Sequence, residues 1–217
     1  MQPLTNEKPK PLATVRGKPL IEYHLDHLSR AGVREFVVNT GWLGAQIPKA
    51  LGDGSRWGAR IQYSVEDWPA LESGGGIFHA LPLLGAEPFV VVNGDVYIEY
   101  DWRRLLAFAI GQRSEPWLAH LVLVPNPDHN PVGDFALADG RVVASTGPRY
   151  TFSGVSLLHP RLFAGCSPGA FPLAPLLRSV VEEGAVTAEL HEGLWSDVGT
   201  LERLAALERR IGSGQST

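Results

Sequence analysis

The 217-residue sequence contains almost no sulfur: Cys166 is its single cysteine and Met1 its single methionine. One cysteine cannot form a disulfide within the chain, which is typical of a reducing compartment. No run of 18 uncharged apolar residues occurs, and residues 1–12 are polar and proline-rich, unlike a signal peptide. We therefore expect a cytoplasmic protein that does not span a membrane.

An excess of positive charge is also lacking. The chain has 19 Lys and Arg residues against 23 Asp and Glu residues, and no long basic block. Because proteins that bind duplex nucleic acid normally present a basic face, we do not expect nucleic acid as a partner. A small phosphorylated ligand stays compatible, since a few cations and backbone amides can bind it.

Hydrophobic residues make up 44% of the chain, which is enough to bury a core. Through the first half, strand-like apolar runs alternate with helical patterns. Residues 20–31 have apolar side chains at i, i+4 and i+7 before Gly32 and predict a helix, whereas the apolar run 88–93 predicts a buried strand. The alternation predicts an α/β fold with a Rossmann-like, mostly parallel sheet flanked by helices.

The second half carries shorter strand patterns, including a pair about the hairpin dipeptide Asp139-Gly140. They predict a small β-rich part within the same fold. No internal repeat or long linker divides the chain. We therefore expect one domain over residues 1–211, followed by a flexible tail at 212–217.

Two carboxylates stand at places where ligands of parallel sheets bind, beyond the ends of predicted strands. Asp95 follows the run 88–93, and Asp197 lies between a late strand and the last helix. Mg²⁺ prefers oxygen ligands and is commonly held by one or two carboxylates and phosphate oxygens. The alternatives are a simple turn at Asp95 and a helix N-cap at Asp197.

Two further segments have a composition suited to phosphorylated ligands. Ser73 to Gly76 is rich in glycine, which is unfavourable inside a helix or strand and predicts a loop whose amides approach a ligand. A flexible start of a helix is the alternative. Lys10 lies between two prolines that stiffen the backbone, and an ordinary solvated loop lysine is the alternative there.

These segments occur together, and in this order, in one known family. The stretches PLTNEKPKPL, LESGGGI, NGD and WSDVGT make the chain similar to the sugar-1-phosphate nucleotidyltransferases, and the matching stretches span nearly the whole sequence. The stretches FSG, GDF and LAPLLR favour the branch that acts on N-acetylmuramate 1-phosphate in cell-wall (peptidoglycan) recycling. The resemblance implies the fold of nucleotide-diphospho-sugar transferases.

The resemblance also implies roles for single residues. Asp95 and Asp197 would bind Mg²⁺ as the cofactor, and Lys10 would contact the phosphates. The implied nucleobase or ribose contacts are Glu72, Ser73, Gly74 and Gly75. The implied lining of the sugar-phosphate pocket is Asn93, Asp134, Ser153 and Gly154, with Asn39 a weaker candidate. Nucleotide binding would fall in about residues 1–125, and sugar-phosphate binding in about residues 126–200.

The implied reaction joins UTP to a sugar 1-phosphate by in-line attack on the α-phosphorus, which releases pyrophosphate. Because the nucleophile is already anionic, positioning and charge neutralisation would supply most of the catalysis. Guanylyl transfer to mannose or heptose 1-phosphate is one alternative, and a non-catalytic, regulatory nucleotide-sugar-binding domain is another. A Rossmann oxidoreductase is disfavoured, because no GxGxxG follows a strand. No feature of the sequence indicates the oligomeric state.

One departure from the family pattern lies at the start. The family begins with a buried strand and a GxGxR phosphate loop, whereas this chain opens at Met1-Gln2-Pro3-Leu4-Thr5, which aligns with the last part of that motif. A shortened start, a truncated chain and an inactive relative are all compatible with this difference. We expect the absent strand to lie centrally in the sheet, so the 217-residue chain should be a poorer enzyme than an extended form.

Overall fold

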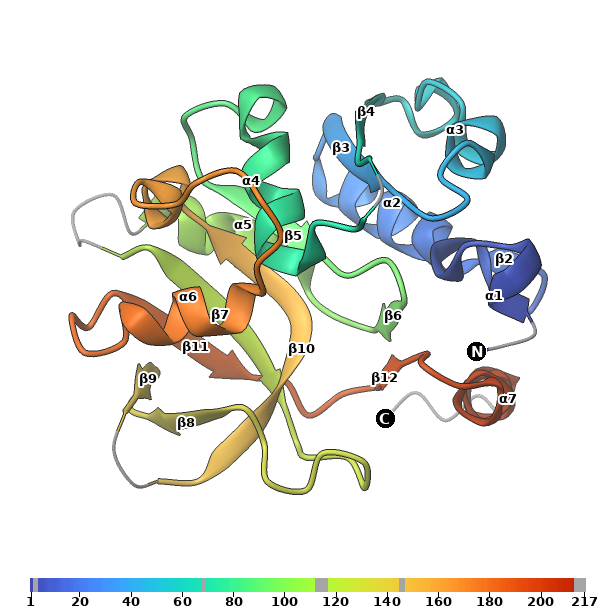
Figure 1. Ribbon diagram of the computed structural model, residues 1–217. Helices are drawn as coiled ribbons and strands as arrows, with labels where there is room; N and C mark the ends of the chain where they lie inside the picture. Colours follow the sequence, from blue (N-terminus) through green and yellow to red (C-terminus); the bar gives the residue numbers. More distant parts are fainter. Residues whose placement is uncertain (2–3, 68, 112–116, 145–146, 213–217) are drawn as a thin grey trace. The chain divides into compact units, whose positions relative to one another are not determined.

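The computed structural model describes residues 1, 4–67, 69–111, 117–144 and 147–212 (Figure 1). Its contacts divide the chain into two compact units. Unit 1 comprises Met1–Ala70, Asn93–Trp102 and Gly193–Thr217, and unit 2 comprises Leu71–Val92 and Arg103–Glu192. Unit 1 is therefore assembled from three separate stretches of sequence, and unit 2 from two.

Unit 1 is built from short helices and two-stranded sheets. Its helices are α1 (Leu4–Glu7), η1 (Lys10–Leu12), α2 (Leu20–Ala31), α3 (Gln46–Leu51), η2 (Ser55–Trp57) and α7 (Leu201–Gly212). Its strands are β1 (Thr14–Val15), β2 (Lys18–Pro19), β3 (Glu35–Thr40), β4 (Arg60–Val65), β6 (Val96–Ile98) and β12 (Trp195–Asp197). Strands pair as β1·β2, β3·β4 and β6·β12.

Helix α2 has the bounds that its sequence pattern predicts. It ends at Gly32, whose left-handed φ of 108° lets its N–H reach the carbonyls of Leu28 and Ser29. The apolar side of α2 forms a core with residues of α3 and β4, including Leu25, Leu51 and Ile61. The parallel pair β3·β4 is thus covered by the amphipathic helix that precedes it in the sequence.

The pair β6·β12 connects the middle of the sequence with its C-terminal part. Tyr97 of β6, Val198 after β12 and Leu207 of α7 share a buried cluster with Val15 and Leu20. Because Leu207 is 1% exposed, helix α7 is fixed to this strand pair by its apolar side.

Unit 2 contains one six-stranded sheet and the helices that cover it. The helices are α4 (Glu72–Leu84), α5 (Trp102–Gly111, whose first residue groups with unit 1), η3 (Pro160–Phe163) and α6 (Leu173–Ser179). The strands are β5 (Phe89–Val92), β7 (Ala119–Val124), β8 (Phe135–Ala138), β9 (Arg141–Val143), β10 (Arg149–Leu158) and β11 (Val186–Leu190). None of the helices in the described ranges of either unit is long and apolar enough to cross a membrane.

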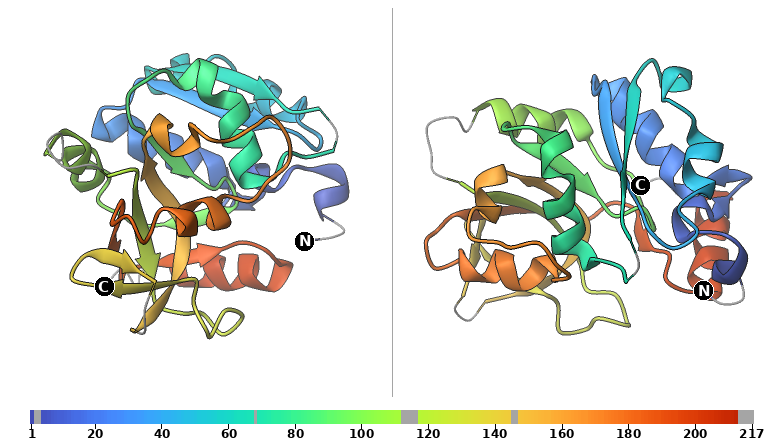
Figure 2. Two further views of the ribbon diagram at one scale, coloured as in Figure 1. Left: turned by 60° about the vertical axis from the view of Figure 1, so that its left-hand side comes forward. Right: turned by 45° about the horizontal axis from the view of Figure 1, so that its top comes forward.

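The sheet of unit 2 has the order β5-β10-β7-β11-β9-β8, and β8 pairs with β10 as well. The sheet therefore curls until its last strand meets the long strand β10. Helices α4 and α6 lie next to each other and contribute Ile77, Leu173 and Leu177 to its core (Figure 2). These residues and those of the strands form one buried apolar cluster of unit 2.

The prediction of a mostly parallel sheet is wrong for the described strands, although helices and strands do alternate as predicted. Only β3·β4 and β7·β11 pair in parallel there, whereas β10 runs antiparallel to β5, β7 and β8. Parallel neighbours need a crossover of a dozen or more residues, and both parallel pairs have one. The hairpin β8–β9 reverses the chain instead, and β9 and β10 both run antiparallel to β8.

The predicted hairpin about Asp139-Gly140 is confirmed. These residues join β8 to β9 with φ values of 49° and 73°, as a two-residue hairpin turn requires. The predicted division near residue 125 follows the chain order, whereas both observed units are discontinuous, and the assignment of ligands to those parts stays a prediction. Gly212 is the last residue of α7, and the rest of the predicted tail, 213–217, lies outside the described residues.

Candidate functional site

Asp95 and Asp197, the predicted metal ligands, are neighbours across one strand pair of unit 1. Asp197 lies opposite Val96 in the register of β6·β12. One step further, the Val198 N–H donates to the carbonyl oxygen of Asp95 at 2.8 Å. The pairing of β6 with β12 therefore brings together two carboxylates that are a hundred residues apart in the sequence.

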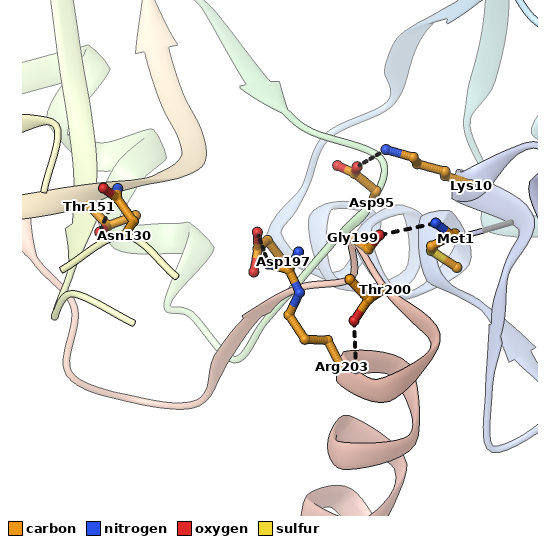
Figure 3. Close-up of polar contacts among 9 residues, drawn as sticks. All are labelled: Met1, Lys10, Asp95, Asn130, Thr151, Asp197, Gly199, Thr200 and Arg203. Carbon is orange, nitrogen blue, oxygen red and sulfur yellow. Dashed lines mark hydrogen bonds and ion pairs between the residues drawn. The ribbon is translucent and has the colours of Figure 1, made fainter. Parts of the chain in front are cut away.

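The turn that carries Asp95 is closely packed against the segment of Lys10. A Cβ on Gly94 would lie 2.8 Å from Cγ of Pro11, so glycine allows this close approach. The Lys10 ammonium consequently lies 3.5 Å from Oδ2 of Asp95 (Figure 3). Both side chains are substantially exposed, so this ion pair contributes little to stability, and its value lies in placing a cation beside the carboxylate.

Asp197 faces a cation that the sequence analysis missed. Nη1 of Arg203 donates to Oδ2 of Asp197 at 2.6 Å (Figure 3). Helix α7 is capped by Thr200, whose Oγ1 accepts from the Arg203 N–H at 3.1 Å, so Asp197 is not needed as the cap. The signal that could have revealed Arg203 is a basic residue in the first helical turn, where acidic residues are favoured.

The chemistry of the two carboxylates fits a magnesium ion that is completed by substrate oxygens. Within the described ranges, no group of three or more His, Cys, Asp or Glu side chains could hold a metal ion. Two carboxylates are nevertheless the usual protein share of a Mg²⁺ site that binds phosphates. Each of them already has a cation beside it, Lys10 or Arg203, so a metal ion would have to compete with that cation for the carboxylate.

The glycine-rich segment of unit 2 is not the loop that its composition predicts. Helix α4 begins at Glu72 and contains all three glycines. The N–H groups of Gly74 and Gly75 both donate to the carbonyl oxygen of Phe171, at 2.9 and 3.0 Å. The first amides of a helix have no partner within it, and here a neighbouring segment satisfies two of them, which offsets the poor helix propensity of glycine.

The same segment explains why the glycines have no side chain. A Cβ on Gly74 would lie 2.5 Å from Cδ2 of Phe171. Ser73 adds a contact to this segment, because its Oγ accepts from the Leu173 N–H at 3.0 Å. Glu72 is exposed and has a left-handed φ of 60°, an unfavourable conformation for a residue with a side chain. The nucleotide contacts expected of these residues stay predictions.

Three of the residues predicted for the sugar-phosphate pocket lie around one β-bulge in unit 2. The register of β10 against β7 shifts at this place, and Gly154 there has a φ of 81°. Oδ2 of Asp134 accepts from the Phe152 N–H at 2.8 Å, and the Ser153 hydroxyl donates to the carbonyl oxygen of Val122 at 2.6 Å. Bulges are frequent beside functional sites because they redirect side chains.

A polar network next to this bulge was not recognised from the sequence. The Thr151 hydroxyl donates to Oδ1 of Asn126 at 3.0 Å. It accepts from Nδ2 of Asn130 at 3.1 Å (Figure 3). These bonds fix the loop between β7 and β8 to β10. The loop carries two Asn-Pro dipeptides, a turn signal that could have indicated an ordered segment leading to Asp134.

The remaining candidates are the two asparagines at strand ends. Asn93 follows β5, is exposed, and accepts the Val96 N–H on its carbonyl oxygen at 3.2 Å. It therefore belongs to the turn of Asp95. Asn39 is exposed and stands next to the last residue of β3, so its role rests on sequence alone.

Comparison with known sequences gives matches over most of the chain. The family described as "Nucleotidyl transferase" matches residues 1–143. The N-acetylmuramate alpha-1-phosphate uridylyltransferase of Neisseria meningitidis serogroup B is 47% identical, over 98% of this chain and 94% of that protein. The enzyme of the same name from Caulobacter vibrioides is 35% identical, over 97% and 91%.

Solved structures agree with these matches at the level of the fold. A Bacillus anthracis protein crystallised with a sucrose aligns over 96% of this chain and 90% of its own, with a TM-score of 0.84 and 21% identity. HddC from Yersinia pseudotuberculosis aligns over 94% and 91%, with a TM-score of 0.75 and 20% identity. At such identities the likeness concerns the α/β fold alone.

Proposed function

Because the chain belongs to the nucleotidyl transferase family, and within it is a sugar-1-phosphate nucleotidyltransferase, we propose that it transfers a uridylyl group to N-acetylmuramate 1-phosphate. The observation that carries this proposal is the similarity, over nearly the full chain, to two N-acetylmuramate uridylyltransferases. One mannose-1-phosphate and one heptose-1-phosphate guanylyltransferase match 58% and 71% of the chain, and another mannose-1-phosphate guanyltransferase matches 92% of it but is 27% identical. The chain is an enzyme, so the non-catalytic alternative is not retained.

The proposed reaction is a displacement at phosphorus. An anionic phosphate oxygen of the sugar 1-phosphate forms a bond to the α-phosphorus of UTP. The bond from that phosphorus to the β-phosphate oxygen breaks, and the electron pair leaves with pyrophosphate. No proton has to be removed from the nucleophile, so the enzyme has to align the groups and compensate charge.

The residues of unit 1 supply the charge compensation in this proposal. Asp95 and Asp197 would hold Mg²⁺, which would neutralise phosphate charge when bound. Lys10 lies beside Asp95 and contacts a phosphate oxygen. The strand pairing of β6 with β12 fixes these groups on rigid backbone, and such preorganisation is the main requirement for phosphoryl-type transfer.

The residues of unit 2 supply recognition in this proposal. The bulge around Ser153 and Gly154 contacts the sugar phosphate, with Asp134 holding its shape through the Phe152 N–H. The start of helix α4, from Glu72, contacts the nucleobase or ribose. A site that pairs its polar groups with uracil leaves them unpaired with another base, which disfavours the wrong nucleotide.

The direct test is a competition assay. UTP, GTP, ATP and CTP are offered with N-acetylmuramate 1-phosphate and Mg²⁺, and the sugar nucleotides formed are separated and quantified. Mannose 1-phosphate and a heptose 1-phosphate replace the acceptor in parallel reactions. We expect UDP-N-acetylmuramate as the main product.

Two results would contradict the proposal. A clear preference for GTP with mannose or heptose 1-phosphate would move the protein to guanylyl transfer. If UTP is consumed with another sugar 1-phosphate but not with N-acetylmuramate 1-phosphate, the protein is a uridylyltransferase with a different acceptor.

A further inference from the structure

Arg203 stands at a place in unit 1 where its own helix does not favour it. It lies in the first turn of α7, close to the positive end of the helix dipole, where acidic residues such as Glu202 are stabilising. Its guanidinium is held instead by Asp197, at 2.6 Å. The partner that makes this position favourable is thus one of the two proposed metal ligands.

The backbone beside Asp197 leaves room for this guanidinium. A Cβ on Gly199 would overlap Nη2 of Arg203, so the arginine occupies space that any side chain at position 199 would fill. Gly199 does not have a positive φ, so its backbone conformation alone does not require glycine. A side chain at position 199 would therefore push the Arg203 guanidinium aside.

Resting on the proposed function, we propose that Arg203 is a phosphate-binding residue that Asp197 holds in place until the metal ion binds. A divalent cation on Asp197 neutralises the carboxylate and repels the guanidinium. The guanidinium then pairs with a phosphate oxygen that arrives with the substrate. Planar guanidinium groups suit this exchange because they bind carboxylate and phosphate oxygens with the same paired geometry.

The contrast with Lys10 supports a distinct role for Arg203. Lys10 lies 3.5 Å from Asp95, a looser contact, and its side chain is 47% exposed. The Arg203 side chain is 29% exposed and its contact with Asp197 is 0.9 Å shorter (3.5 − 2.6 Å). Arg203 therefore competes with a metal ion for its carboxylate more strongly than Lys10 does.

The first test measures metal binding without nucleotide or sugar. Mn²⁺ alone is titrated into the protein, and free Mn²⁺ is followed by its electron paramagnetic resonance signal. Arg203→Gln removes the competing cation, so we expect Mn²⁺ to bind about two- to fivefold more tightly, the range of one partly exposed ion pair. Arg209→Gln, on the exposed side of the same helix, is the matched control and should bind as wild type.

The second test measures anion binding in the presence of Mn²⁺. Inorganic pyrophosphate and N-acetylmuramate 1-phosphate are titrated separately by calorimetry. Arg203→Gln should weaken one of them by about tenfold, as expected for a lost hydrogen bond between charged groups. Loss for pyrophosphate places Arg203 on the triphosphate, and loss for the sugar 1-phosphate places it on the acceptor. Arg203→Lys should restore part of the loss.

A second variant displaces the guanidinium without removing it. Gly199→Ala should raise Mn²⁺ affinity and weaken the same anion as Arg203→Gln does. The cap of α7 is kept in both variants, because it uses the main-chain N–H of Arg203. Thermal unfolding of each variant verifies that it is folded.

The proposal fails if Arg203→Gln is folded, binds Mn²⁺ no more tightly than wild type, and binds both anions normally. Arg203 would then serve only the packing of α7. The Mn²⁺ and pyrophosphate measurements involve neither a nucleobase nor a sugar. A failure of the proposed uridylyl transfer is therefore distinguishable from a failure of this inference.

Discussion

Nε2 of His24 lies 2.7 Å from the carbonyl oxygen of Val96, the residue that follows Asp95. Because a carbonyl only accepts, Nε2 carries the proton and donates. His24 is 5% exposed, and its Nδ1 has no hydrogen-bond partner among the described residues. A buried, neutral imidazole on helix α2 thus fixes the start of β6 and with it the turn of Asp95.

This burial predicts a loss of stability in acid. Desolvation lowers the pKa of His24 from 6.5 to about 4, despite the opposing hydrogen bond to Val96. Above pH 6.5, His24 is neutral in both the folded and the unfolded state, and its contribution to the free energy of unfolding is fully present. Between pH 6.5 and 4 the unfolded state binds the proton first, so the free energy of unfolding should fall by about 3 kcal/mol.

The measurement is urea unfolding at several pH values, for wild type and His24→Gln. Glutamine keeps an N–H donor and does not titrate. Burial also lowers the pKa of His27 and of His159, so acid should destabilise both proteins. The difference between the two proteins isolates His24, and parallel stability curves would show that His24 does not govern the acid response.

Replacing either proposed metal ligand should abolish most turnover. Asp95→Asn and Asp197→Asn keep the shape of the side chain but remove the charge that holds Mg²⁺. We expect kcat to fall by about a hundredfold or more, with little change in thermal unfolding. Pyrophosphate release is the measurement, and Asp139→Asn, at the exposed β8–β9 turn, is the control. Near-normal rates in the Asp95 or Asp197 variant would remove that residue from the site.

Replacing a glycine by alanine should affect stability in opposite directions in helix α4 and in helix α5. Gly74→Ala would place a methyl group 2.5 Å from the ring of Phe171, and should destabilise unit 2 by about 1–3 kcal/mol. Gly111→Ala, in helix α5, meets no atom within 4 Å and should be neutral or stabilising by up to about 1 kcal/mol. Thermal unfolding of both variants decides, and equal melting temperatures would refute the packing argument.

Replacing Asp134 should have an effect that depends on whether the new side chain keeps an oxygen to accept from the Phe152 N–H. Asp134→Ala leaves the Phe152 N–H without its partner and should cost about 1–2 kcal/mol of stability. The same variant should raise KM for the sugar 1-phosphate more than KM for UTP, because the bulge loses its support. Asp134→Asn keeps an acceptor and should lose less of both. An unchanged KM for the sugar 1-phosphate in the alanine variant would separate the bulge from substrate binding.

The sequence predicts single elements better than their pairing. Residues 20–31 form the predicted helix and residues 89–92 form a strand within the predicted run 88–93, because a strong apolar pattern defines each of them. The direction in which two strands pair depends on where the connections between them reverse the chain. Strand β10 runs antiparallel to β7 because the β8–β9 hairpin between them reverses the chain. The glycines after Ser73 were misinterpreted because their partner, Phe171, lies about a hundred residues away.

The candidate site, too, could be predicted from the sequence only in part. Asp95 and Asp197 could be selected because each interrupts a recognisable strand-to-turn boundary, and the structure places Asp197 in β12 and Asp95 directly before β6. Arg203 was not selected, because its place in the first helical turn does not by itself reveal the contact with Asp197, which depends on how the chain turns at Gly199. Local patterns reveal residues at the ends of elements, but not the residues that reach them from elsewhere.

The interleaving of the two units has a consequence for the order of synthesis. The strands and helices of unit 2 all lie before residue 193, whereas unit 1 takes β12 and α7 from residues beyond it. A growing chain can therefore complete the sheet of unit 2 while the β6 edge and Asp95 still await their partners. A product that terminates before Asp197 would lack one of the two proposed metal ligands, so we expect it to be inactive even where the sheet of unit 2 is present.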